Sequence, residues 1–237
     1  MRGVKNSKVF HEPYKNPYHF GPERISKLFP DQPPNEDFTY ENISSGFKED
    51  FSNMELVFCK DMAKHIEKHF DILFDDSLAD FHHTFLIRNP NKSVKSAYKL
   101  YLETGKGKFY PEEAGFRQMF ELYEFVKFQT GTKPMIIDAD DLLDNPEDTM
   151  KAYFDAIGCS FDKSILTWTD GSIPCCRQEE FWHEYLFKSS GFVSKSDKEN
   201  HSNPARLPEE VEACIEECLV YYNHLYKERL LPVKEQK

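Results

Sequence analysis

One stretch near the middle of the chain most constrains the fold. Between residues 83 and 98 an apolar run, a sharp break and an amphipathic segment follow one another. Residues 85–87 are Phe-Leu-Ile, a run typical of a parallel strand covered on both faces. Asn89 suits a helix N-cap, and Pro90 suits the first helical position, where an N–H has no helical partner. The sequence therefore predicts a strand, a turn and a helix, the unit from which α/β folds are built.

Two polar residues of this stretch are candidates for binding a ligand. Arg88 follows the predicted strand, and open α/β sheets bind ligands at the carboxyl ends of their strands. Its guanidinium can hold a phosphate through two parallel hydrogen bonds. Ser96 lies about 9 Å along the next helix, so a phosphate lying along that helix could meet both groups. The alternative is that Arg88 makes an ordinary surface ion pair.

The sequence Arg-Asn-Pro, with Ser96 eight residues after the arginine and Tyr98 beyond it, resembles the 3′-phosphate-binding segment of sulfotransferases. These enzymes use 3′-phosphoadenosine 5′-phosphosulfate (PAPS) as co-substrate. The resemblance implies that Arg88 and Ser96 bind its 3′-phosphate and that a small-molecule hydroxyl or amine accepts the sulfuryl group. It runs over nearly the whole chain and includes a related group labelled branched-chain aminotransferase-like. It implies a single domain over residues 1–237, with a three-layer α/β fold of the P-loop type and a parallel sheet flanked by helices.

A second candidate site follows the first predicted strand, residues 8–11. Pro13 stops this strand and places His11 and Glu12 at its carboxyl end, the ligand edge of a parallel sheet. In several sulfotransferase branches a glutamate near this place is the general base. The resemblance implies that Glu12, with His11, takes the proton from the acceptor hydroxyl. The alternative is that Glu12 caps a helix or pairs with an arginine.

The strand predicted over residues 55–62 ends in Lys60, Asp61 and Met62. In cytosolic sulfotransferases the matching strand end carries a lysine and, two positions later, a catalytic histidine. Lys60 fits the lysine, whereas Met62 occupies the place of the histidine, so we look for the base in Glu12 or Asp61. Lys60 would donate to the sulfuryl oxygens as charge builds on the bridging oxygen. The alternative is a solvent-exposed lysine at a strand end.

Other segments yield structural predictions. His65 and His69 have a spacing that can bind zinc, but no third ligand is evident. We interpret them as the polar face of an amphipathic helix. Further helices are predicted over residues 21–29, 111–129 and 208–231, and a buried strand over residues 133–138.

The resemblance also implies an element that this sequence does not supply. Sulfotransferases begin with a strand and a loop that cradles the 5′-phosphosulfate, and that strand lies between those at 56–60 and 84–87. The pattern G-x-x-x-x-G-K-[ST] is absent, and residues 105–108 do not fit it. We expect that the two strands pair directly, that the sheet has a gap, or that the chain is truncated. The alternative function is a catalytically inactive relative that binds nucleotide or a protein partner.

Charge and composition argue against several functional classes. A net charge of −11 argues against non-specific nucleic-acid binding. Residues 88–108 nevertheless carry six basic residues and one acid, an excess that fits a polyanionic nucleotide. No stretch approaches about 18 consecutive apolar residues, so no membrane span is predicted. The six cysteines have neither disulfide nor zinc spacing, which favours a reduced, cytoplasmic protein.

Overall fold

The computed structural model describes two compact units of the chain. The described residues are 4, 6–104, 109–168, 189–192 and 207–231. The first unit is Met1–His83 with Gly105–Lys133, and the second is Thr84–Thr104 with Pro134–Lys237. The single domain over residues 1–237 stays a prediction.

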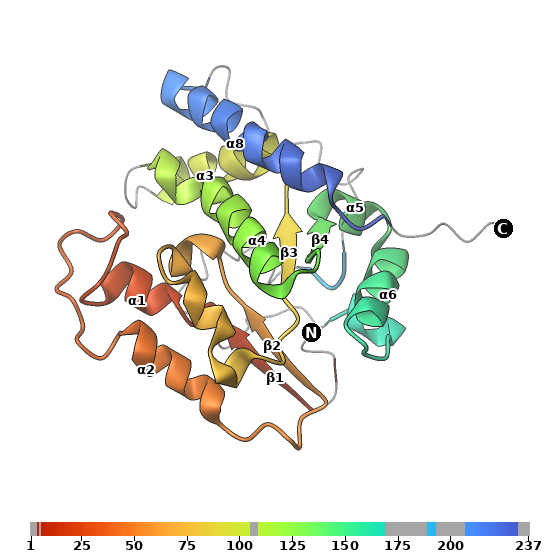
Figure 1. Ribbon diagram of the computed structural model, residues 1–237. Helices are drawn as coiled ribbons and strands as arrows, with labels where there is room; N and C mark the ends of the chain where they lie inside the picture. The colour runs from red at the N-terminus through yellow and green to blue at the C-terminus, as the bar shows by residue number, and fades with distance from the viewer. Residues whose placement is uncertain (1–3, 5, 105–108, 169–188, 193–206, 232–237) are drawn as a thin grey trace. The chain divides into compact units, whose positions relative to one another are not determined.

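The first unit contains two parallel strands, β1 (Ser7–His11) and β2 (Leu56–Lys60), which lie side by side in Figure 1. Its helices are α1 (Lys15–Phe20), α2 (Tyr40–Ser45) and α4 (Phe116–Thr130), with the 3-10 helices η1 (Gly46–Lys48), η2 (Ala63–Ile66), η3 (Phe70–Phe74), η4 (Asp76–Leu78) and η5 (Pro111–Ala114). The last residues of the two strands, His11 and Lys60, lie opposite one another in the ladder. The residues that follow both strands therefore leave the same edge.

Aromatic side chains form much of the core of the first unit. Tyr14, Tyr40 and Phe47 are almost fully buried, and the Tyr14 and Tyr40 rings stack with their centroids 6.0 Å apart. Their hydroxyls have partners: Tyr14 shares a hydrogen bond of 3.0 Å with Ser44, and Tyr40 donates to the carbonyl of His65 at 2.8 Å. Burial of large rings whose hydroxyls are satisfied stabilises this unit.

Two local predictions for the first unit are wrong. Residues 21–29 are not helical; the helix lies earlier and ends at Phe20. A side chain at Gly21 would collide with the carbonyl oxygen of Phe38, so a glycine is needed where this second backbone segment passes. The predicted helix with His65 and His69 on a polar face is also absent. Instead, His65 lies in η2 with only 2% of its surface exposed.

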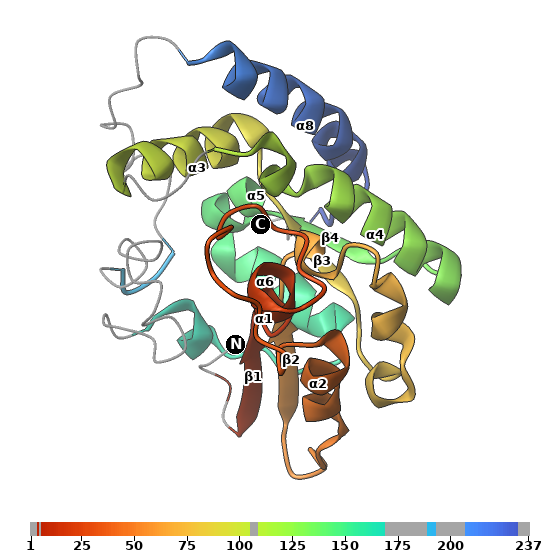
Figure 2. The ribbon, with the colours of Figure 1, turned by 90° about the vertical axis from the view of Figure 1, so that its left-hand side faces the viewer.

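The second unit repeats the strand-and-helix arrangement. Its parallel strands are β3 (Thr84–Ile87) and β4 (Met135–Asp138), and its helices are α3 (Pro90–Thr104), α5 (Ala139–Asp144), α6 (Pro146–Ala156), η6 (Lys163–Leu166) and α8 (Glu209–Lys227). The helices α3 and α8 pack against each other, as Figures 1 and 2 show. The Asn89 side chain accepts the N–H of Asn91 at 2.9 Å, which confirms the predicted cap of α3.

The strands of the second unit are buried on one face more than on the other. Phe85, Ile87 and Ile136 are buried, but Leu86 is 58% exposed. The prediction that residues 85–87 are covered on both faces is therefore wrong for the middle residue. Asp138, at the end of β4, is buried and accepts the hydroxyl proton of Tyr222 at 2.9 Å.

Parallel strands flanked by helices confirm the predicted α/β class. The described strands form two separate two-stranded sheets, β1–β2 and β3–β4. The first sheet belongs to the first unit and the second sheet to the second, so the three alternatives for residues 56–60 and 84–87 stay predictions. Among the described helices, none is both long and apolar enough to cross a bilayer.

Candidate functional site

Glu12 and Lys60, predicted from separate strands, form one ion pair. The Lys60 Nζ donates to the Glu12 Oε1 in a charge-assisted hydrogen bond. The Glu12 side chain is 10% exposed and that of Lys60 is 44% exposed. The register of β1 and β2 explains why these side chains meet, because His11 lies opposite Lys60 and Glu12 is the next residue. The pair thus presents a partly solvated cation beside a nearly buried carboxylate.

The backbone of Glu12 adopts a conformation that side-chain-bearing residues rarely occupy. Its φ of 47° lies in the left-handed region, which costs on the order of 1–3 kcal/mol for a residue other than glycine. Neighbours hold it there: its N–H donates to the Lys60 carbonyl at 2.6 Å, and its carbonyl accepts from the Lys15 N–H at 3.2 Å. Strain of this kind persists where the surrounding structure over-determines it, often at functional sites.

The electrostatic surroundings of Glu12 favour its ionised form. Burial alone raises the pKa of the Glu12 carboxyl, but the charge and hydrogen bond of Lys60 oppose that effect. Charges on His65 and His11 act in the same direction as Lys60, and the pKa of Glu12 ends below its ordinary value. Glu12 is therefore a carboxylate at neutral pH, able to accept a proton.

Asp61 has partners on every side of its carboxylate. Its Oδ1 accepts the N–H of Met62 at 2.7 Å and lies 2.6 Å from the Nδ1 of His65. Its Oδ2 accepts the N–H of Tyr14 at 2.8 Å. Asp61 thus connects the segment after β2 to the segment after β1.

A buried ion pair lies beside these groups. Lys64 Nζ lies 2.9 Å from the Glu113 Oε2, and both side chains are more than nine-tenths buried. Glu113 also accepts hydrogen bonds from Tyr18 at 3.1 Å and Ser26 at 2.8 Å. Burial raises the pKa of the Glu113 carboxyl, but the charge and hydrogen bond of Lys64 and the hydrogen bond of Ser26 outweigh it, so the pKa of Glu113 lies below its ordinary value.

We call six of these residues the charged cluster of the first unit: Glu12, Lys60, Asp61, Lys64, His65 and Glu113. His19 packs against it, with its ring centroid 5.5 Å from that of His65. The Nδ1 of His19 is buried without a hydrogen-bond partner among the described residues. Burial, aided by the nearby charges of His65 and Lys64, lowers the pKa of His19 to about 3.

The two predicted nucleotide-binding residues lie in the second unit and have a different character. Arg88 follows β3 directly, Ser96 lies two turns into α3, and both side chains are exposed. Neither makes a hydrogen bond or ion pair with another residue in the described part of the chain. A guanidinium and a hydroxyl in this state retain all their donors for an incoming anion.

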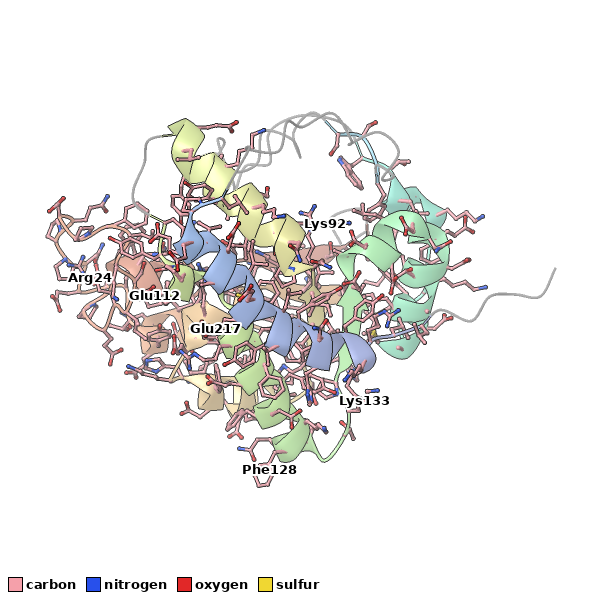
Figure 3. All side chains as sticks on the ribbon, turned by 90° about the horizontal axis from the view of Figure 1, so that it is seen from above. Arg24, Lys92, Glu112, Phe128, Lys133 and Glu217 are labelled. Atoms are coloured by element: carbon pink, nitrogen blue, oxygen red, sulfur yellow. The ribbon has the colours of Figure 1, made fainter. Side chains whose placement is uncertain are left out.

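Basic residues flank Ser96 on the same side of α3. Lys92 and Lys99 lie four residues before and three residues after it, so the three share one helix face. Figure 3 shows Lys92 at the beginning of α3. Both oxygens of the Asp140 carboxylate lie 2.8 Å from the Lys92 Nζ, and Lys99 lies 3.5 Å from Glu103. Acidic partners therefore compensate part of the predicted basic excess, and residues 105–108 lie outside the described chain.

Comparison with known proteins gives the family. The family model of the sulfotransferase domain matches residues 51–204, more than half of the chain. The chain belongs to the sulfotransferase family. The matched range includes Lys60, Asp61, Arg88 and Ser96, whereas His11 and Glu12 precede it.

Two curated relatives of this sulfotransferase-family chain come from Arabidopsis thaliana. Branched-chain-amino-acid aminotransferase-like protein 2 is 33% identical over 169 residues, which cover 69% of this chain and 27% of the relative. Branched-chain-amino-acid aminotransferase-like protein 1 is 32% identical over 121 residues, which cover 47% of this chain and 19% of the relative. The chain thus spans less than a third of either protein. Among solved structures, the sulfotransferase domain from the curacin biosynthetic pathway matches with a TM-score of 0.45 and 13% identity, covering 74% of this chain and 67% of that one.

Sequence reasoning missed the partners of the predicted residues in this sulfotransferase domain. The sequence analysis considers His65 with His69, whereas the structure pairs it with Asp61, which stands four residues before His65, a spacing that often brings side chains together. That spacing could have predicted the contact between Asp61 and His65. No sequence pattern predicts the Lys64–Glu113 pair, because 49 residues separate its members.

Proposed function

We propose that this chain transfers a sulfuryl group from PAPS to a hydroxyl or amine of a small-molecule acceptor. The observation that carries the proposal is the Glu12–Lys60 ion pair at the strand ends of a sulfotransferase-family domain. Sulfuryl transfer requires a group that takes the acceptor proton and a cation that meets the charge building on the leaving oxygen. One contact supplies both groups.

The chain's own residues divide the chemical step between them. PAPS, when bound, supplies the sulfuryl group and leaves as 3′,5′-adenosine bisphosphate. Glu12 accepts the proton that the acceptor oxygen loses as that oxygen bonds to sulfur and the bond from sulfur to the bridging oxygen breaks. Lys60 donates to the bridging oxygen as that oxygen gains negative charge. When Lys60 turns towards this oxygen, Glu12 loses the partner that lowers its pKa and becomes a stronger base.

Arg88 and Ser96 would hold the 3′-phosphate of the nucleotide. The guanidinium fork matches two phosphate oxygens, and the serine hydroxyl adds a further donor. Their exposure and their lack of partners among the described residues support this role, because no existing contact has to break. Lys92 and Lys99, on the same helix face as Ser96, would add a favourable field.

Transfer of label from radiolabelled PAPS to a set of phenols, aliphatic alcohols and amines tests the proposal. We expect the wild-type chain to transfer label to at least one acceptor. Glu12→Gln should lower the rate by about 10²- to 10⁴-fold, the usual contribution of a general base. The matched control is Glu55→Gln, an exposed carboxylate at the opposite end of β2, which should leave the rate unchanged.

The two candidate functions give different results in this assay. If 3′,5′-adenosine bisphosphate binds but wild-type protein transfers no label, the chain is a nucleotide-binding relative without activity. If label is transferred and Glu12→Gln turns over at the wild-type rate, Glu12 has no part in the reaction.

A further inference from the structure

The strained turn at Glu12 has to be held in place. β1 ends at His11, and the chain turns at Glu12 through its left-handed conformation before α1 begins at Lys15. The Lys60 carbonyl holds the N–H of Glu12. The second attachment is two residues later, where the N–H of Tyr14 donates to Asp61. The turn is thus fixed on both sides by the segment that ends β2.

Asp61 can act as this attachment because its own orientation is fixed. The same carboxylate accepts the N–H of Met62 and the Nδ1–H of His65. His65 is 2% exposed, and its ring packs against those of Tyr18 and His19, with centroids 5.1 and 5.5 Å away. A ring buried in this way cannot touch a substrate, so any effect of His65 on catalysis must pass through its neighbours.

We infer that Asp61 and His65 form a buried positioning pair that keeps the Glu12 carboxylate in its turn and against Lys60. The inference rests on the proposed function, in which Glu12 is the base. It gives Asp61 a role other than that of the base itself, because hydrogen-bond donors already engage both of its oxygens. His65 does not touch the reacting atoms and acts through Asp61 and through its charge on Glu12.

Charged groups on three sides determine how Glu12 titrates. Lys60 faces it from β2, His11 from β1 and His65 from η2, and all three lower the pKa of the Glu12 carboxyl against the opposing effect of burial. His65 in turn faces Asp61, and His19 faces His65 from α1. Removal of His65 therefore takes away one of three groups that lower the pKa of Glu12 and should raise that pKa.

A direct titration of Glu12 tests the pair without any enzyme assay. The carboxyl carbon of Glu12 is followed by NMR in protein with labelled glutamate, and its signal is assigned by its loss in Glu12→Gln. We expect His65→Gln to raise the pKa of Glu12, because it removes one of the groups that lower it. Asp61→Asn should shift the same pKa, because it releases the turn that holds the carboxylate against Lys60. The matched control, Glu112→Gln, removes a half-exposed carboxylate of the same unit and should leave the titration unchanged. Unchanged titration of Glu12 in folded His65→Gln and Asp61→Asn overturns the inference.

Amide hydrogen exchange of the wild-type chain tests the positioning pair even if both variants fail to fold. The Tyr14 amide should exchange as slowly as amides within β1, because Asp61 holds it. Exchange at the rate of an open turn would mean that Asp61 does not hold the turn, and the inference would be wrong.

Kinetics separate this inference from the proposed function. In an active enzyme, Asp61→Asn should lower kcat by up to ~100-fold through misplacement of the base, with unchanged affinity for 3′,5′-adenosine bisphosphate. The acidic limb of its pH–rate profile should move with the pKa of Glu12, which mere loss of folded protein cannot cause. If Glu12 titrates as expected but wild-type protein transfers no label, the proposed function fails and the positioning pair stands.

Discussion

The polar residues that follow β1 and β2 differ from those that follow β3. After β1 and β2, Glu12 and Lys60 bond to each other, and Asp61 is fully engaged with its neighbours. After β3, Arg88 and Ser96 are exposed and make no polar contact within the described chain. The first unit therefore places these charged groups before any ligand arrives, whereas Arg88 and Ser96 in the second unit face solvent and keep their donors available for a ligand.

This difference suits two different tasks. Groups that stabilise a transition state act best when they are already oriented, because no reorganisation is then needed during the reaction. Groups that bind a phosphate contribute affinity when their hydrogen bonds form only with the ligand. Mutations should separate the two kinds: loss of an engaged group should affect stability, and loss of an uncommitted group should affect binding alone.

The largest effect should come from the buried pair of the first unit. Lys64→Met leaves the Glu113 carboxylate buried without its counter-charge, and removal of one member of such a pair destabilises a protein by about 3–5 kcal/mol. In the second unit, Arg88→Ala should change the free energy of unfolding by no more than about 0.5 kcal/mol. Urea unfolding followed by circular dichroism measures both.

An exposed ion pair next to the buried one supplies the control. Lys27 pairs with Glu112 at 2.6 Å, but the two side chains are 65% and 50% exposed. Lys27→Met should therefore destabilise the protein far less than Lys64→Met does. Equal losses in Lys64→Met and Arg88→Ala would remove the distinction between the two units.

A smaller effect should appear in the pH dependence of stability. His19 has a folded-state pKa of about 3, well below the unfolded value of 6.5. Between these values the unfolded chain binds a proton that the folded chain does not, so stability falls as the pH falls. One such group contributes a slope of up to about 1.4 kcal/mol per pH unit. Denaturant unfolding between pH 7 and 5 should show a flatter slope for His19→Gln than for wild type.

The control for this slope is His82→Gln, which changes an exposed histidine of the same unit. It should retain the wild-type dependence on pH. If His19→Gln also retains the full slope, the His19 ring is not kept neutral by burial.

The strands could be predicted from the sequence because each is a short apolar run that ends in polar residues. Residues 8–11, 55–62, 84–87 and 133–138 correspond to β1, β2, β3 and β4. Helix ends were harder to predict where they depend on a backbone segment far away in the sequence. At Gly21, just after α1, the carbonyl of Phe38 passes so close that a side chain would collide with it. The helix predicted from residue 111 is also divided, because Gly115 has a left-handed φ of 78° and α4 begins only after it.

The candidate site could be predicted only as a set of positions. Polar residues at the carboxyl ends of parallel strands pointed to Glu12, Lys60 and Arg88. That Lys60 contacts Glu12 depends on the register of β1 and β2, which the sequence does not specify. The burial of His65 depends on packing by residues far along the chain. The roles of Arg88 and Ser96 stay predictions.

Titration calorimetry of 3′,5′-adenosine bisphosphate tests the central claim most directly. The account predicts binding to wild-type protein that weakens by about 10- to 150-fold in Arg88→Ala and by about tenfold in Ser96→Ala, because hydrogen bonds to charged groups contribute about 1.5–3 kcal/mol. Lys48→Ala, which removes an equal charge from the exposed surface of the first unit, should bind as wild type does. Equal affinity in Arg88→Ala and Lys48→Ala, or no binding to wild-type protein, would contradict the account.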